Sequence, residues 1–144
     1  MTRVFPIIGL IAWAAVSFAT EAGYTGAKLH VMVENLKNDK GQVVIAIFDN
    51  KKDYLKKPVG EAAVAIGEDL TSETEFDNLP AGTYAIAAYH DKNKNGDLDT
   101  LIVVPKEDYG FSNDARSLFG PPSFKSASFE FNGSEDLHIT IRAK

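Results

Sequence analysis

The stretch that decides the fold is Thr83-Tyr84-Ala85-Ile86-Ala87-Ala88-Tyr89-His90. Successive side chains of a strand point to opposite faces, so its even and odd positions would lie on different sides of a sheet. Tyr84, Ile86 and Ala88 would lie on one face, and Ala85, Ala87 and Tyr89 on the other. The stretch is therefore the clearest strand candidate in the chain.

Other strand patterns surround this one. Residues 29–34 alternate between apolar and polar side chains, and residues 42–48 form a nearly continuous apolar run. Further candidates are 62–66, 71–76, 101–104, 124–131 and 136–142. With no long amphipathic helix, the pattern predicts an all-β fold, a single antiparallel β-sandwich of about seven strands, transthyretin-like or immunoglobulin-like.

Turn signals suggest how the strands pair. The segment Asn38-Asp39-Lys40-Gly41 separates the first two candidates, and we expect these to form an antiparallel hairpin. Asn132-Gly133 is a strong hairpin signal between the last two.

Residues 1–19 have the features of a cleavable signal peptide. Arg3 precedes an uncharged run from Val4, and the small residues Ser17 and Ala19 have the spacing that signal peptidase accepts. A membrane anchor is the alternative, but a spanning helix needs about 20 apolar residues and this run contains Pro6. We expect a periplasmic or secreted protein, with residues 20–144 as one β-sandwich domain and no membrane span after cleavage.

Charge and cysteine content narrow the classes of function. The chain has 144 residues, a net charge of −5 and no cysteine. Loss of Arg3 with the leader would make the net charge about −6, which argues against nucleic acid and anionic lipid as partners. The absence of cysteine excludes disulfides, thiolate zinc sites and cysteine catalysis.

The segment from Asp91 resembles the front of a calcium loop. Oxygen-bearing side chains stand at its first, third and fifth positions, Gly96 at the sixth and an acid at the ninth. Alternate side chains of a tight turn can converge on a cation that prefers six to eight oxygen ligands. The pattern predicts a Ca²⁺ site at Asp91, Asn93, Asn95, Asp97 and Asp99.

One departure from the calcium-loop pattern keeps an alternative open. The twelfth position, where a bidentate glutamate belongs, is Ile102, so another carboxylate, such as Glu107, Asp108 or Asp114, would have to contribute. The alternative is an ordinary turn whose Asn and Asp side chains bond to their own backbone.

The segment 105–124 is long for a connection in a compact domain and contains four aromatic residues. One interpretation is that the rings pack beneath the segment and fix it. The other is that they border a ligand groove, which predicts a binding site at Tyr109, Phe111, Asn113 and Arg116.

Four motifs resemble one family of exported bacterial proteins. They are Leu79-Pro80-Ala81-Gly82-Thr83-Tyr84-Ala85, His90-Asp91-Lys92-Asn93-Lys94-Asn95-Gly96-Asp97-Leu98-Asp99, Pro105-Lys106-Glu107-Asp108-Tyr109-Gly110-Phe111-Ser112-Asn113 and Pro121-Pro122-Ser123-Phe124. Together they resemble the family catalogued as domain of unknown function 2141, and the first is similar to an element of transthyretin-like and carboxypeptidase-regulatory-like domains. The resemblance implies a signal-bearing β-sandwich and no particular activity.

We expect a non-enzymatic binding module for an unknown small molecule, a glycan or an envelope protein. One alternative is a structural or assembly protein of the cell envelope that acts through its sheet edges and segment 105–124. A small hydrolase using carboxylates near Asp91 is the other, although no motif of a nucleophilic or metal-dependent hydrolase occurs.

Overall fold

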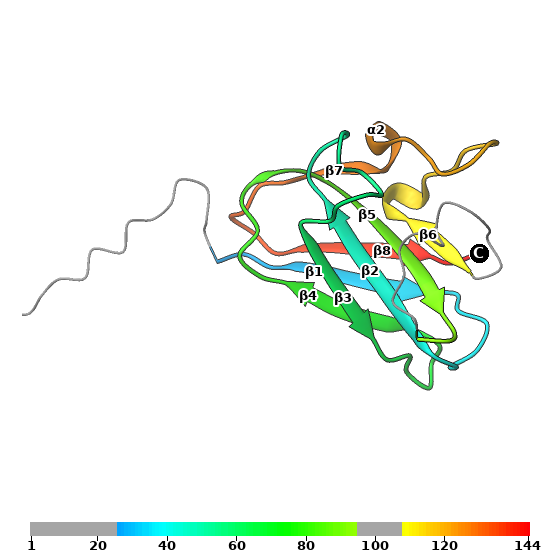
Figure 1. The fold of residues 1–144 in the computed structure, drawn as a ribbon. Coiled ribbons are helices and arrows are strands. Elements are labelled where there is room, and N and C mark those ends of the chain that lie inside the picture. Colours follow the sequence, from blue (N-terminus) through cyan, green and yellow to red (C-terminus); the bar gives the residue numbers. More distant parts are fainter. Residues whose placement is uncertain (1–25, 95–107) are drawn as a thin grey trace, which may run out of the picture.

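The computed structural model describes residues 26–94 and 108–144, which form two β-sheets packed face to face (Figure 1). The predicted leader and the candidate strand 101–104 lie outside these residues. The predicted all-β sandwich is confirmed, with eight strands in the described part of the chain. The elements are β1 Leu29–Glu34, β2 Gln42–Phe48, β3 Gly60–Val64, β4 Ser72–Phe76, β5 Gly82–Asp91, β6 Tyr109–Phe111, η1 Ser112–Asp114, α2 Phe124–Ala127, β7 Ser128–Phe131 and β8 Leu137–Arg142.

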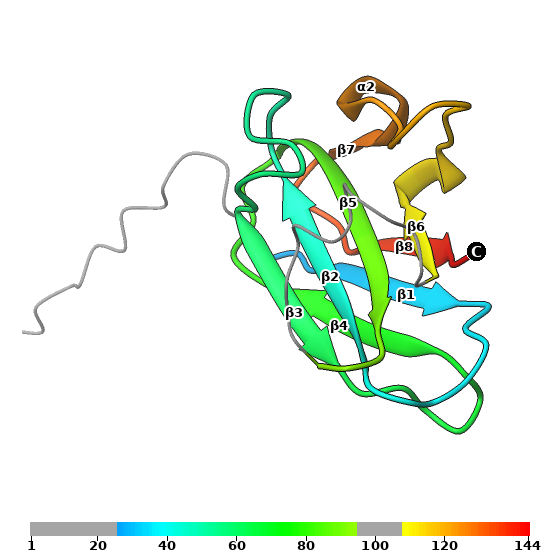
Figure 2. The same ribbon diagram turned by 45° about the vertical axis from the view of Figure 1, so that its right-hand side comes forward.

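One sheet has the strand order β4-β1-β8 and the other β3-β2-β5-β6, with β7 also paired to β5. All pairings are antiparallel except that of β1 with β8, which is parallel. Both predicted hairpins are wrong, because β1 and β2 lie in different sheets, as do β7 and β8 (Figure 2). The Asn132 side chain accepts hydrogen bonds from the backbone of Ser134 and Glu135, and this turn directs the chain to the other sheet.

Two hydrophobic cores stabilise the fold. The first lies between the sheets and includes Leu29, Ile45, Ile86 and Ile141, all fully buried. The second lies on the outer face of the five-stranded sheet, where Phe48 and Phe111 pack beneath segment 50–57 and α2. Residues 43–48 are buried on both faces for this reason, as their continuous apolar run predicts.

The two sheets approach each other at the corner between β6 and the end of β8. Tyr109 and Lys144 exchange two backbone hydrogen bonds, with N···O distances of 3.2 and 3.0 Å. Gly110 permits this approach, since a Cβ atom there would lie 2.5 Å from Ile141 Cγ2 and 2.9 Å from the Arg142 carbonyl oxygen. The corner thus brings residues of β6 beside the last residues of the chain. Among the described residues, no helix is long and apolar enough to cross a membrane.

Candidate functional site

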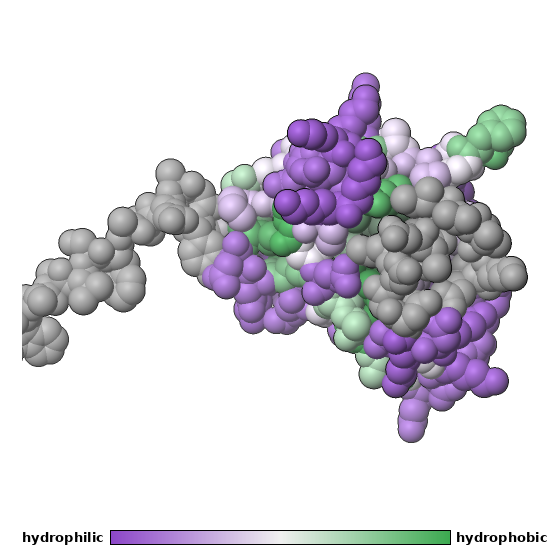
Figure 3. All heavy atoms as spheres, viewed as in Figure 1, coloured by the Kyte–Doolittle hydropathy of each residue, from purple (hydrophilic) through white to green (hydrophobic). Residues whose placement is uncertain are grey.

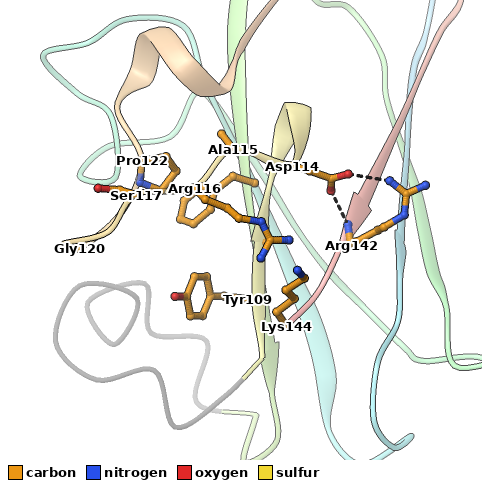
Figure 4. Close-up of a pocket in the computed structure, with 11 residues that line it drawn as sticks. Tyr109, Asp114, Ala115, Arg116, Ser117, Gly120, Pro122, Arg142 and Lys144 are labelled. Atoms are coloured by element: carbon orange, nitrogen blue, oxygen red, sulfur yellow. Dashed lines mark hydrogen bonds and ion pairs between the residues drawn. The ribbon is translucent and has the colours of Figure 1, made fainter.

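A pocket of about 140 Å³ lies at this corner, between β6, the end of β8 and the loop that joins η1 to α2 (Figure 4). Three of the four residues predicted to bind a ligand line it: Tyr109, Phe111 and Arg116. Asn113, the fourth, is not among its lining residues. The remaining lining residues are Gly110, Asp114, Ala115, Ser117, Gly120, Pro122, Arg142 and Lys144.

The aromatic side of the pocket is built by β6. The register of β6 on β5 pairs Tyr109 with Tyr89 and Phe111 with Ala87, which directs both rings to the outer face of the five-stranded sheet. Phe111 is buried, whereas Tyr109 is 37% exposed, and their ring centroids lie 5.9 Å apart in an edge-to-face arrangement. The buried Phe111 ring therefore packs against the Tyr109 ring, which a ligand can reach.

Two cations converge over this aromatic surface. In Figure 4 the Arg116 guanidinium and the Lys144 ammonium group point toward one another, beside the Tyr109 ring. Neither side chain has a hydrogen bond or an ion pair with any residue that the structure describes. Two neighbouring positive charges repel each other, so an anion between them would relieve that repulsion.

The third cation of the pocket is already paired. Arg142 donates to Asp114 Oδ2 at 2.6 Å and to Glu34 Oε1 at 2.8 Å. The hydrogen bond from Arg142 to Asp114 is the main reason why the pKa of Arg142 is raised. Asp114 is also the one side-chain carboxylate among the described lining residues, and it is paired with Arg142 and not with Arg116 or Lys144.

Other residues of segment 108–124 pack beneath it and fix it to the domain, as the first interpretation of its aromatic residues predicts. Phe111 and Phe124 pack into the second core, and the Asn113 amide donates to the carbonyl oxygen of Ser128 at 2.7 Å and of Ser126 at 3.3 Å. These contacts fasten η1 to the chain around α2. Some residues of the segment therefore hold it to the domain, and others line the pocket.

Only part of the predicted calcium loop can be placed. Asn95, Asp97 and Asp99 lie outside the described residues. Asp91 is the last residue of β5, is fully buried and accepts a hydrogen bond from Gln42 Nε2 at 3.0 Å. Asn93 is exposed just beyond the strand.

Asp108, considered as a further calcium ligand, faces away from Asp91. The His90 backbone donates to the Asp108 carbonyl at 2.8 Å, so Asp108 continues the pairing of β6 with β5 opposite His90. Adjacent residues of a strand point to opposite faces, and Asp108 therefore shares the inner face with His90, not the outer face with Asp91. Its Oδ1 accepts a hydrogen bond from Lys37 at 2.6 Å.

A second group of polar residues occupies the outer face of the three-stranded sheet. The rings of His30 and His138 stack with centroids 4.4 Å apart, and His30 Nδ1 lies 3.0 Å from Glu75 Oε1. These residues border a shallow groove of about 360 Å³. No group of three or more potential ligands within residues 26–94 and 108–144 is arranged to hold a metal ion.

Sequence reasoning missed Arg142, Lys144 and the His30–His138 stack. Each depends on strand pairing between distant parts of the chain, β6 with Lys144 and β1 with β8. The alternation of Leu137, Ile139 and Ile141 predicts that Arg142 and His138 face outward, but it carries no signal for the strand beside them.

Comparison with known proteins identifies the family. No curated protein and no solved structure matches the chain. The profile of a family described as "Uncharacterized protein conserved in bacteria (DUF2141)" matches residues 31–140. The match begins within β1 and ends within β8, and it confirms the resemblance drawn from the sequence motifs. The chain therefore belongs to the DUF2141 family.

Proposed function

We propose that the protein is an exported, non-enzymatic module that binds an anionic ligand in the pocket between Tyr109, Arg116 and Lys144. The observation that carries this proposal is the convergence of the two cations, which have no ion pair among the described residues. The ligand presents a carboxylate, sulfate or phosphate group to the cations, and its adjoining atoms lie on the exposed Tyr109 ring.

The dimensions of the pocket favour a small anionic group. Pockets for drug-sized ligands measure about 300–1,000 Å³, and this one measures about 140 Å³. Two charge-assisted hydrogen bonds of about 1.5–3 kcal/mol each would give a free anion a dissociation constant on the order of a millimolar. A larger ligand would gain further affinity from the surface around the pocket.

The charges of the pocket support binding more than hydrolysis. Acid–base hydrolysis of a glycoside requires two carboxyl groups that flank the bond. The described lining contains one side-chain carboxyl group, that of Asp114, and Arg142 donates two hydrogen bonds to it. Asp97 and Asp99, on which the hydrolase alternative depends, lie outside the described residues.

The test is a titration of the isotope-labelled protein with sodium phosphate, followed by NMR. Sodium chloride of equal ionic strength corrects for general screening. We expect saturable shifts at Gly110, Arg116 and Lys144, and loss of saturation in Arg116→Ala and Lys144→Ala. Lys57→Ala removes the same charge from an exposed turn outside the pocket and is the matched control.

A result in which phosphate and chloride shift the same resonances equally would contradict the proposal. Equal effects of Lys57→Ala and Arg116→Ala would contradict it as well, because the response would then follow net charge.

We also propose that calcium stabilises the loop 91–99. The basis is the spacing of its oxygen-bearing residues, together with the rigid position of Asp91 at the end of β5. Ligand binding to the folded state raises its stability, so we expect a higher Tm in millimolar calcium than in chelator or in magnesium.

Asp91→Ala alone is an ambiguous test of that site, because it also removes the bond from Gln42. The informative quantity is the difference between Tm values with and without calcium in each variant. Asp99→Asn should abolish that difference with little effect on the Tm in chelator. An unchanged difference in both variants would refute a calcium site.

A further inference from the structure

A pair of apolar side chains projects from the loop that forms one wall of the pocket. Leu118 is 95% exposed and Phe119 is 92% exposed, far more than Val59 at 51%, the next most exposed large hydrophobic residue among those described. Figure 3 shows an apolar projection from the loop between η1 and α2, beyond the surface of the sandwich. We call Leu118 and Phe119 the apolar tip.

The loop holds the apolar tip away from the protein. Ser117 Oγ accepts a hydrogen bond from the Phe119 backbone N–H at 3.3 Å and donates to the Phe119 carbonyl at 3.1 Å. Gly120 follows with φ of +72°, a conformation that glycine adopts readily, and Pro122 is buried behind it. The turn therefore presents two side chains that could otherwise fold back onto the domain.

The apolar tip and the pocket belong to one surface. Arg116, Ser117, Gly120 and Pro122, which flank the tip, also line the pocket that Lys144 borders. The chain is acidic overall, but at physiological ionic strength charges beyond about 8 Å are largely screened. Asp114, the one acidic side chain among the described lining residues, is paired with Arg142, so a ligand at this end of the molecule meets Arg116 and Lys144 as its nearest unpaired charged side chains.

We propose that this surface docks onto a phospholipid bilayer, with a lipid phosphate between Arg116 and Lys144 and the apolar tip inserted among the acyl chains. Basic residues beside exposed Leu and Phe are typical of segments that bind the membrane interface. The inference rests on the proposed anion site and names its ligand class. It also replaces the expectation, drawn from net charge alone, that anionic lipid is excluded.

The area of the apolar tip favours a bilayer over a protein partner. Two side chains of this kind bury at most about 400 Å², which is half of the roughly 800 Å² that each partner buries in a standard protein interface. The tip is convex, and its chain neighbours Arg116, Ser117 and Gly120 are exposed and polar or small. A fluid bilayer accepts such a projection without a complementary cavity.

The experiment is sedimentation of the protein, as exported by the expressing cell, with vesicles of equal parts phosphatidylcholine and phosphatidylglycerol. We expect Leu118→Ser combined with Phe119→Ser to weaken vesicle binding at least tenfold, since each buried apolar side chain is worth about tenfold or more in affinity. That variant should keep its response to free phosphate. Arg116→Ala with Lys144→Ala should weaken both, and Val59→Ser should bind as the wild type does.

A fluorescent variant tests insertion at the apolar tip itself. Trp13, in the predicted leader, is the one tryptophan of the chain. Phe119→Trp in a Trp13→Phe background therefore places a single reporter at the tip, and its emission should shift to shorter wavelength with vesicles. An unshifted emission, or equal vesicle binding by the tip variant and the wild type, overturns the proposal.

The two proposals fail separately. Saturable phosphate binding without vesicle binding overturns lipid docking and leaves the anion site intact. Loss of phosphate binding in the wild type overturns both.

Discussion

The two outer faces of the sandwich differ in what covers them. On the five-stranded sheet, segment 50–57, η1 and α2 cover a second core that contains Phe48 and Phe111. On the three-stranded sheet the outward residues of β1, β4 and β8 are polar, histidine or methionine, and they border an open groove. The first face supports the pocket and its loop, whereas the second carries ion pairs at its surface.

The largest expected difference lies between Phe48→Ala and Met32→Ala. Phe48 is fully buried on the covered face, and its truncation should lower the free energy of unfolding by about 3–5 kcal/mol. Met32 points outward from β1, and its truncation should cost about 1 kcal/mol or less. Urea unfolding of the two variants measures the contrast. Equal losses would mean that the three-stranded face is also covered in solution.

This contrast is also where sequence reasoning is most successful. The continuous apolar run of 42–48 predicts burial on both faces, and the alternation of 29–34 predicts burial on one. Both patterns are set by each residue's own surroundings, so they are visible without knowledge of the partner strand. The wrong hairpin between these strands came from the turn signal at residues 38–41, because a turn marks a change of chain direction and does not specify the partner strand.

The pocket was predictable to a similar extent. Tyr109, Phe111 and Arg116 belong to one segment whose length and aromatic content attract attention. Lys144 and Arg142 join them only through the pairing of β6 with the chain end, which Gly110 permits and no local pattern indicates. The Asn113 side chain is of a type that can bind a ligand. It instead donates two hydrogen bonds to backbone carbonyls from a residue with a positive φ, so it stabilises the loop.

The next largest loss of stability is expected at Ser112, whose side chain connects η1 to β5 and to the end of α2. Its hydroxyl is fully buried, accepts from the Ile86 backbone N–H at 2.9 Å and donates to the carbonyl oxygen of Ala127. Ser112→Ala leaves buried groups unpaired and should cost about 1–3 kcal/mol.

Ser128→Ala is the control for Ser112, because it removes an exposed bond to the Lys125 carbonyl. Its loss should stay within about 0.5 kcal/mol. If the two variants lose equal stability, the hydroxyl of Ser112 does not hold η1 to the sheet.

A substitution at Tyr54 is expected to increase the stability of the protein. Its ring packs against Phe48 and Phe124, but its buried hydroxyl has no hydrogen-bond partner among the described residues. Tyr54→Phe removes an unsatisfied polar group and should stabilise the protein by up to about 1 kcal/mol. A destabilised variant would indicate that the hydroxyl bonds to a buried water.

Tyr54 should also make the stability of the protein depend on pH. Burial raises the pKa of Tyr54 from its ordinary value of 10 to about 12. The unfolded chain therefore loses this proton first, so the contribution to stability is complete below pH 10 and is lost as the pH rises toward 12. Stability between those values should fall less steeply in Tyr54→Phe than in the wild type, as alkaline unfolding curves would record.

The smallest expected effect belongs to the open face. Glu75 accepts a hydrogen bond from Lys28 at 2.9 Å and lies beside His30, and the bond from Lys28 is the main reason why the pKa of Glu75 is lowered. A lowered pKa means that the carboxylate stabilises the fold at neutral pH and ceases to do so as the pH falls through its titration. Both partners are exposed, so solvent screens most of the interaction.

Glu75→Gln should therefore produce a slight fall in Tm at neutral pH and low salt. The difference from the wild type should shrink as the pH falls through the titration of the carboxylate and vanish once it is protonated. It should also vanish in ~1 M salt, where the Debye length is about 3 Å. Glu73→Gln is the matched control, since Glu73 faces the same groove from the same strand and has no ion pair among the described residues. A Glu75→Gln effect that survives both acid and salt would mean that Glu75 stabilises the face by packing, and the contrast between a face held by its core and a face held by charge would fail.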